Sequence, residues 1–346
     1  MLRKLAVIPA ALTSLALVAC GPHKPVDFSQ GVPTKQQATI AMPASSSSGL
    51  RAPGSPELPA AEQLQALGVA MNQATQGETA GLYQITVGAT YLVNGATQWL
   101  LLALASGVAH KPSSVTGDTA VYGPYTPYLS AITWRLTVTR TGFNTFTYIL
   151  DGQDKTKPAS DWVTVISGSH AVTVDANDNA IKGFGEGVFL IEWDKAKTLP
   201  GRSQDTGTCE VHYGKVDPKS DAFIDVSFNN VGGGANAQPF NAEYRFTLDN
   251  EQAGTFQFAL DLNLNIFDPA RAAAERLSIE SRWMSTGAGR GDVTAHGGDL
   301  VSPITVNECW DAAFLSQYYT KSDEPFIGYG HETNNCSFTT AEYSAL

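Results

Sequence analysis

The sequence predicts an α+β fold that is mainly β: a large antiparallel meander sheet, of which a half-barrel is one form, with one face covered by two or three helices. From residue 131 onward, apolar and polar residues alternate with period two, as expected of strands with one packed face and one wet face. Stretches rich in Gly, Asn and Asp separate these runs and favour short connections between neighbouring strands. Helical apolar spacing occurs before the strands and near the end of the chain.

The N-terminus has the pattern of an export signal. Arg3 and Lys4 precede an apolar run that ends at Ala19, and at about 15 residues this run is shorter than the ~20 that span a bilayer as a helix. We therefore expect residues 1–19 to be a signal peptide. Its removal changes the formal net charge from −11 to −13, because Arg3 and Lys4 are lost. A chain this acidic is not expected to bind nucleic acid, which requires a basic surface.

Cys20 ends a more specific pattern. The run Leu17-Val18-Ala19-Cys20 resembles the lipobox of bacterial lipoproteins. The resemblance implies a diacylglycerol on the Cys20 sulfur, cleavage before Cys20 and acylation of the new amine. Because each buried methylene contributes about 0.8 kcal/mol, several acyl chains would anchor the protein to a membrane. Gly21 replaces the Asp that implies retention at the inner membrane, which favours the outer membrane of the bacterial envelope.

The rest of the chain divides into two parts by composition. Residues 20–57 are rich in Pro, Ser, Gly and Gln, and we expect the lipidated cysteine to be followed here by a disordered tether. Residues 58–346 are expected to form a single β-rich globular domain, which is long enough to bury a stable core.

Three segments have the pattern of helices. Apolar residues at spacings of three and four predict a helix over residues 58–76. Residues 82–108 are strongly apolar but are interrupted by polar residues, which favours a helix buried in a globular domain over a transmembrane span. Thr305 and Glu308 have the spacing of a capping box and predict a helix over residues 306–319.

About nine strands are expected between the second and third helices. In the two clearest runs, aromatic and aliphatic residues alternate with Asn, Gln, Glu, Arg and Asp, so one face of the sheet should be apolar. The expected strands cover the runs 132–138, 146–150, 162–166, 188–193, 211–213, 224–228, 240–248, 256–266 and 277–283.

Cysteine spacing predicts one disulfide. Cys309 and Cys336 are the nearest pair among the three cysteines that follow Cys20, and we expect them to be joined. Cys209 lies in an apolar strand pattern and is expected to be a buried free thiol. The C-x-x-C spacing of zinc ligands is absent, so no zinc site is expected.

The sequence contains no catalytic motif of the kinds considered: a G-x-S-x-G elbow, an H-E-x-x-H motif, a Walker loop or a dinucleotide fingerprint. We therefore predict no catalytic residue and no cofactor, and do not expect an enzyme. Ser169 and His170 are adjacent, but neighbours on a strand point to opposite faces, and a surface turn is the favoured interpretation. The triad Arg290-Gly291-Asp292 invites an adhesion hypothesis, but we expect it to lie in a mobile loop and give it little weight.

One stretch has the spacing of a calcium loop. Asp175, Asn177, Asn179 and Glu186 stand at positions 1, 3, 5 and 12 of an EF-hand pattern. Ala180 replaces the turn glycine, and the flanking segments look like strands. Because Asn and Asp are common in turns for backbone reasons alone, we favour a plain hairpin and predict no metal site, with these four residues as a weak candidate.

A further resemblance concerns the domain itself. The run Val121–Tyr125, Trp134, Trp162 and the run Glu308–Asp311 resemble uncharacterised predicted lipoproteins of Gram-negative bacteria. The order of helix, meander and helices is similar to half-barrels of the LolA/LolB type, which carry acyl chains between a curved sheet and its helices. This second similarity is one of architecture, and fold alone does not determine function.

These observations lead to two functional hypotheses. The first is an envelope lipoprotein with a non-enzymatic binding or scaffold role toward other envelope proteins. The alternative is a carrier or binder of a lipid or other amphiphile in a groove between the sheet and its helices, which the aromatic face of residues 240–266 motivates.

Overall fold

A computed structural model describes residues 26–35, 37–40, 42–43, 74–158, 160–202, 206–232, 239–262, 270–271 and 273–346. Cys20, much of the expected tether and residues 58–73 of the first expected helix lie outside this part of the chain.

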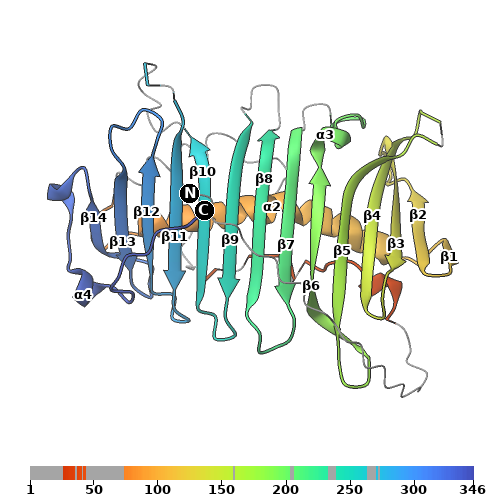
Figure 1. The fold of residues 1–346 in the computed structure, drawn as a ribbon, viewed down its shortest axis with the longest axis horizontal. Coiled ribbons are helices and arrows are strands. Elements are labelled where there is room, and N and C mark those ends of the chain that lie inside the picture. The colour runs from red at the N-terminus through yellow and green to blue at the C-terminus, as the bar shows by residue number, and fades with distance from the viewer. Residues whose placement is uncertain are drawn as a thin grey trace, which may run out of the picture.

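The molecule is built on one antiparallel sheet of fourteen strands that follow one another in chain order (Figure 1). The sheet is open, since β1 and β14 each have a single strand neighbour. The predicted antiparallel meander is therefore confirmed, with more strands than expected, while the half-barrel form stays a prediction. The strands are β1 Ser114–Thr116, β2 Thr119–Tyr125, β3 Ile132–Arg140, β4 Thr145–Asp154, β5 Val163–Val174, β6 Ala180–Glu192, β7 Thr206–Lys215, β8 Ala222–Gly232, β9 Phe240–Leu248, β10 Gly254–Leu262, β11 Glu275–Trp283, β12 Gly289–His296, β13 Ile304–Trp310 and β14 Ser316–Lys321.

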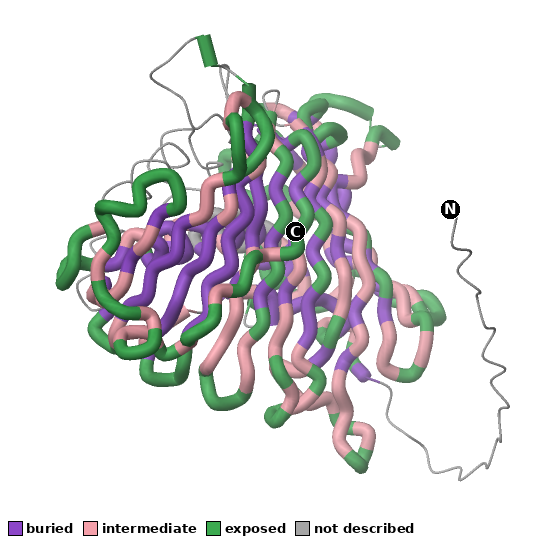
Figure 2. The backbone as a smooth tube through the Cα atoms, turned by 60° about the vertical axis from the view of Figure 1, so that its left-hand side comes forward, coloured by how far each residue is buried: buried purple, intermediate pink, exposed green. Residues whose placement is uncertain are grey.

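Period-two alternation gives the sheet an apolar inner face and a polar outer face. In β9 and β10, Tyr244 pairs with Phe258 and Phe246 pairs with Phe256, and all four rings are nearly fully buried on the inner face. Such ring pairs contribute about 0.5–1.5 kcal/mol each beyond their buried area. The buried positions run as bands along the strands, and exposed residues gather in the connecting loops (Figure 2).

The helix α2, Gly81–Val108, crosses the inner face from one end of the sheet to the other (Figure 1). Its first turn packs on β12, where Gly291 leaves room for Leu82, and its last turn packs on β3, where Gly107 lies against Leu136. This confirms the packed helix predicted over residues 82–108. Within the described residues, no helix has the combination of length and apolar character that a bilayer span requires.

The segment after Cys20 differs from the expected disordered tether. Val26, Val32 and Ile40 are buried in the core, and Gly31 lies directly against the ring of Phe146 on β4. Arg140 adds to the attachment, since its Nη2 donates to the carbonyl oxygen of Val26 at 2.8 Å. The described residues between 26 and 43 are thus part of the domain, because their scattered apolar side chains find partners on the inner face.

The helix predicted over residues 306–319 is wrong. This stretch forms β13 and β14, because Val306 and Trp310 face the inner side while Asn307 and Cys309 face the other. The remaining described helices are short, so the expectation of two or three covering helices is not confirmed. They are α3 Trp193–Ala196, α4 Glu332–Asn335 and the 3₁₀ turns η1 Phe28–Gln30 and η2 Pro325–Ile327.

Candidate functional site

A depression of about 400 Å³ lies on the outer face of the sheet over strands β4 to β8. The strand register places its walls in two neighbouring rows. One row runs from Ala171 through Glu186 to Phe223, and the other runs from Ser169 through Val188 to His212. Since alternate residues of a strand share a face, these side chains all point to the outer side.

Small residues create the hollow. Ser169 and Ala171 on β5 have short side chains, whereas Glu186 on the neighbouring strand β6 has a longer one. Gly214 on β7 has no side chain, and the ring of Phe223 on β8 occupies the space above it, within 2.8 Å of where a Cβ would stand. The same hypothetical Cβ lies 3.1 Å from the Cβ of Glu186. The ring of Phe223 and the side chain of Glu186 therefore lie on either side of Gly214.

The polar groups of the depression are available to a ligand. Within the described chain, the Glu186 side chain is exposed and makes no hydrogen bond or ion pair. His212 Nε2 lies 2.5 Å from Glu210 Oε1 on the same face, and both side chains are about half exposed. Thr141 and Thr145 add hydroxyl groups at the rim. The depression therefore combines the carboxylate of Glu186, the imidazole of His212, hydroxyl groups and the ring of Phe223, and the carboxylate of Glu210 lies next to this lining.

Beneath the depression, on the inner side of the same strands, three polar rings form a buried cluster. The hydroxyl of Tyr213 lies 2.9 Å from His170 Nδ1, and Tyr148 covers Gly168 next to them. Burial lowers the pKa of His170 from 6.5 to about 4, and a hydrogen bond to the backbone of Glu186 offsets part of this effect. Burial likewise raises the pKa of Tyr148 and of Tyr213. All three groups are thus neutral near pH 7 and belong to the core.

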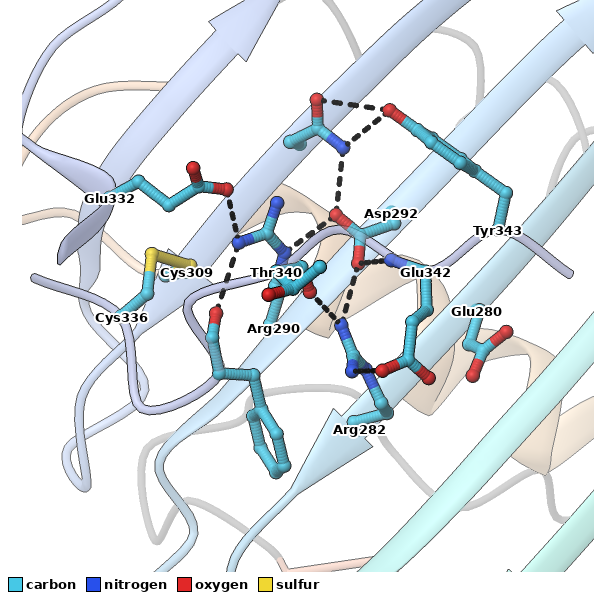
Figure 3. Close-up of polar contacts among 12 residues, drawn as sticks. Glu280, Arg282, Arg290, Asp292, Cys309, Glu332, Cys336, Thr340, Glu342 and Tyr343 are labelled. Carbon is cyan, nitrogen blue, oxygen red and sulfur yellow. Dashed lines mark hydrogen bonds and ion pairs between the residues drawn. A yellow bond between two sulfur atoms is a disulfide. The ribbon is translucent and has the colours of Figure 1, made fainter.

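A second cluster of charged groups lies on the outer face of β11–β13, under the C-terminal segment (Figure 3). Arg290 Nε donates to Asp292 Oδ1 at 2.7 Å, and Arg282 Nη2 donates to Asp292 Oδ2 at 3.1 Å. Asn307 donates its amide to Asp292 Oδ1 at 2.7 Å. The side chain of Asp292 is fully buried, which requires the two guanidinium groups as partners.

The C-terminal segment completes this cluster from above. Glu332 pairs with Arg290, and Glu342 pairs with Arg282, at 2.6 and 2.5 Å (Figure 3). The predicted disulfide between Cys309 and Cys336 is present, with Cα atoms 5.3 Å apart, and it ties the segment to β13. Burial raises the pKa of Glu280, which also faces the carboxylate of Glu342.

The weak calcium candidate is a hairpin turn. Asp175 Oδ1 accepts the backbone N–H of Asn177 at 2.8 Å and of Asn179 at 2.9 Å, and these bonds lower its pKa. Glu186 stands six residues along β6 from Ala180, which places it roughly 20 Å away. The four residues do not converge, and among the described residues no group of His, Cys, Asp and Glu has the arrangement of a metal site.

Two short motifs are also placed. Ser169 and His170 lie in β5 rather than in a turn and point to opposite faces, with His170 buried. Arg290, Gly291 and Asp292 lie in β12, so the expected mobile loop is wrong, and the burial of Arg290 and Asp292 leaves this triad inaccessible to an adhesion receptor.

The sequence alone did not indicate the depression or the charged cluster on β11–β13. Glu186 was noticed only for its calcium-loop spacing, and His212 and Phe223 come from strands whose pairing depends on the whole meander. For the second cluster, the alternation of Arg290 and Asp292 with glycine and Val293 was a strand signal that the tripeptide motif obscured. Cys209, by contrast, is the buried free thiol that was expected.

No protein-family model matches the chain, and no curated protein or solved structure is significantly similar to it.

Proposed function

We propose that this chain is an envelope-anchored lipoprotein with a non-enzymatic binding role, and that its outer-face depression holds a neutral, hydroxyl-rich ligand of the saccharide class. The observation that carries the proposal is the exposed, unpaired carboxylate of Glu186 beside the ring of Phe223 in a concave part of the sheet. Lipid on Cys20 would hold the domain at the membrane, with the outer membrane favoured over the inner.

The chemistry of the depression favours a saccharide. Carboxylates accept charge-assisted hydrogen bonds from hydroxyl groups, and such bonds are stronger than those between neutral partners. The ring of Phe223 offers an apolar surface whose negative face attracts polarised C–H groups. Glu186 in the lining and Glu210 beside His212 repel anions, which argues against phosphorylated or carboxylated ligands.

The spacing of the groups supports binding rather than catalysis. Ser169 and His212 share a row but lie on β5 and β7, two strands apart. Neighbouring strands are about 4.8 Å apart, so these side chains are roughly 10 Å from each other and beyond hydrogen-bond reach.

The inner face gives less support to an amphiphile carrier. Phe228, Tyr244 and Phe258 on this face are buried to within a few per cent of full burial, and Phe240 at the start of β9 is partly buried against them. Their rings contact one another across the strands, as expected of a core. This packing favours a ligand on the outer face over one held between sheet and helix.

Calorimetric titration tests the ligand class. The probes are two neutral trisaccharides, maltotriose and tri-N-acetylchitotriose, and an anionic one, trigalacturonate. At least one neutral probe should bind saturably, and the anionic probe should not. The variant Glu186→Gln should bind at least tenfold more weakly, because the loss of a charged hydrogen bond is worth about 1.5–3 kcal/mol.

Matched controls separate the site from the rest of the surface. Glu251→Gln changes an exposed carboxylate on the turn between β9 and β10, outside the lining of the depression, and should leave the affinity unchanged. Phe223→Ala should weaken binding as Glu186→Gln does. Absence of binding by both neutral probes, or equal affinity in all these variants, would refute the saccharide proposal.

The membrane anchor has its own test. Cells expressing the chain are fed radioactive palmitate, and the protein is isolated from inner-membrane and outer-membrane fractions. Label should appear in the wild-type chain, mainly in the outer membrane, and should be absent from Cys20→Ser. Label that persists in Cys20→Ser would show that the lipobox interpretation is wrong.

A further inference from the structure

We propose that the outer face of β11–β13 is a surface for extended acidic peptides, and that the chain's own last ten residues, 337–346, occupy it as a flap. The proposal is independent of the outer-face depression, which lies over other strands. It predicts that an acidic segment of a partner protein takes the place of the flap.

The contacts of the flap follow the geometry of an extended peptide. The carbonyl oxygens of Phe338 and Thr340 accept from Arg290 and Arg282 at 3.0 and 2.6 Å, and the N–H of Glu342 donates to Asp292 at 3.0 Å. Backbone groups at every second residue therefore face the sheet, which is the period of an extended strand. Recognition through the backbone places few demands on the sequence of the peptide.

One side chain of the flap, Glu342, indicates that the surface favours a negatively charged peptide. The carboxylate of Glu342 lies 2.5 Å from Arg282 Nη1, and the ring of Phe338 lies against the same guanidinium, 5.0 Å from its central carbon. Without the flap, Arg282 would lose the carboxylate of Glu342 and face solvent with Asp292 as its remaining ion-pair partner, whereas Arg290 would keep both Asp292 and Glu332 (Figure 3). The uncovered guanidinium of Arg282 is complementary to a carboxylate.

The flap is separable from the fold beneath it. Strands β11, β12 and β13 are each paired on both sides without it, so the sheet does not need the flap for its backbone hydrogen bonds. None of residues 337–346 is buried, and none of them makes a backbone-to-backbone hydrogen bond within the described chain. The disulfide at Cys336 fixes the base of the flap and leaves the residues after it free to swing.

The polar contacts between the flap and the sheet also favour opening. A flap held by apolar contacts would expose apolar surface when it opened, whereas this flap exposes charged groups that water solvates well. The flap also leaves one donor unsatisfied, since Arg282 Nε is buried without a hydrogen-bond partner in the described chain. A partner that supplies an acceptor there would satisfy a group that the flap does not.

The test uses the full chain and a fluorescein-labelled peptide with the sequence of residues 337–346, followed by fluorescence anisotropy. The wild-type flap should exclude the peptide at micromolar concentrations. In Glu342→Lys the chain's own flap is repelled by Arg282, so the labelled peptide, which keeps its glutamate, should bind saturably. The double variant Arg282→Glu with Glu342→Lys restores an opposite-charge pair and should exclude the peptide again.

A matched control and a second variant keep the outcome decisive. Glu251→Lys introduces the same charge change on an exposed turn and should not admit the peptide. If circular dichroism shows that Glu342→Lys does not fold, the milder Glu342→Gln takes its place. A folded variant that fails to bind the peptide, or a double variant that binds as well as Glu342→Lys does, would overturn the proposal.

Discussion

At the scale of single residues, the inner face of β4–β7 depends on glycines placed opposite large rings. Gly168 lies under Tyr148, and Gly187 lies under Tyr213. The glycines allow three polar rings to be buried side by side next to the backbone. They also bring the backbone close to the rings, so the space for any added atom is small.

Gly187→Ala should therefore destabilise the protein by about 2 kcal/mol, since overpacking of a close-packed core usually costs 1–3 kcal/mol. The new Cβ would collide with the Ser169 carbonyl oxygen and stand 2.5 Å from the Tyr213 hydroxyl. Urea denaturation measures the free energy of unfolding. The control is Gly88→Ala in α2, where a Cβ meets no atom within 4 Å, and it should instead stabilise by about 0.5–1 kcal/mol. Equal effects at both positions would contradict this packing argument.

His170 gives the fold a dependence on pH. Its pKa is about 4 in the folded chain and near 6.5 when unfolded, so the unfolded chain alone takes up a proton between these values. The contribution of neutral His170 is full above pH 6.5 and is lost as the pH falls toward 4. It amounts to about 3 kcal/mol.

The comparison of wild type with His170→Gln isolates this term from the titration of the carboxylates. The free energy of unfolding should fall more steeply from pH 7 to pH 4.5 in the wild type than in His170→Gln. The two curves should run parallel above pH 7, where the imidazole is neutral in both states. Parallel curves across the whole range would show that His170 does not titrate as proposed.

At the scale of elements, α2 begins on a glutamate that is distant in sequence. Leu82 N donates to Glu308 Oε2 at 2.7 Å, and the Ser316 hydroxyl donates to Glu308 Oε1 at 2.6 Å. The first N–H groups of a helix lack partners within the helix, and a carboxylate there also interacts favourably with the helix dipole. Glu308 was predicted to cap a helix of its own but instead caps α2, which ties β13 to the start of the long helix.

Removing this cap should loosen the start of α2. Glu308→Ala is expected to lower the free energy of unfolding by about 3 kcal/mol, because buried hydrogen bonds to a charged group are worth about 1.5–3 kcal/mol each. Hydrogen exchange at Leu82 should also become faster. Glu251→Ala, at an exposed turn, should change neither quantity. Unchanged exchange at Leu82 in Glu308→Ala would argue against the capping role.

At the scale of the whole molecule, the described residues between 26 and 43 connect α2 to the strands β3 and β4. Asn94 Oδ1 accepts the N–H of Ile40 at 2.8 Å, and Asn94 Nδ2 donates to the carbonyl of Ile40 at 2.9 Å. One side chain on the helix thus pairs with the segment as a neighbouring strand would. This contact spans more than fifty residues of chain and brings Ile40 into the core.

Asn94→Ala should destabilise the protein by about 2 kcal/mol, because it leaves two partly buried backbone groups of Ile40 without partners. Protease cleavage between residues 26 and 43 should become faster as the segment detaches more often. Asn177→Ala, in the hairpin turn between β5 and β6, is the matched control and should leave the cleavage rate unchanged. If both variants resist the protease like the wild type, Asn94 does not hold the segment.

Prediction succeeded where one local pattern decides the outcome. The alternation of residues 240–248 predicted which side chains face the core, and the apolar run of residues 82–108 predicted a packed helix. It failed at residues 306–319, where both faces of a strand are buried, so the period-two signal is weak and a local capping pattern misleads. The strands β1, β2 and β12–β14 were also missed: β1 has only three residues, β2 is interrupted by Gly123 and Pro124, and β12–β14 carry polar residues on a covered face.

The sequence by itself therefore determined the class of the fold, the packed helix and the one disulfide, because each follows from periodicity or from spacing along the chain. The tertiary structure alone decided which side chains meet: the walls of the depression, the Arg282–Asp292–Arg290 cluster and the flap that covers it. These groups come from strands whose neighbours depend on the order and register of the whole meander. Long-range pairing is a property of the complete sheet, and no single segment encodes it.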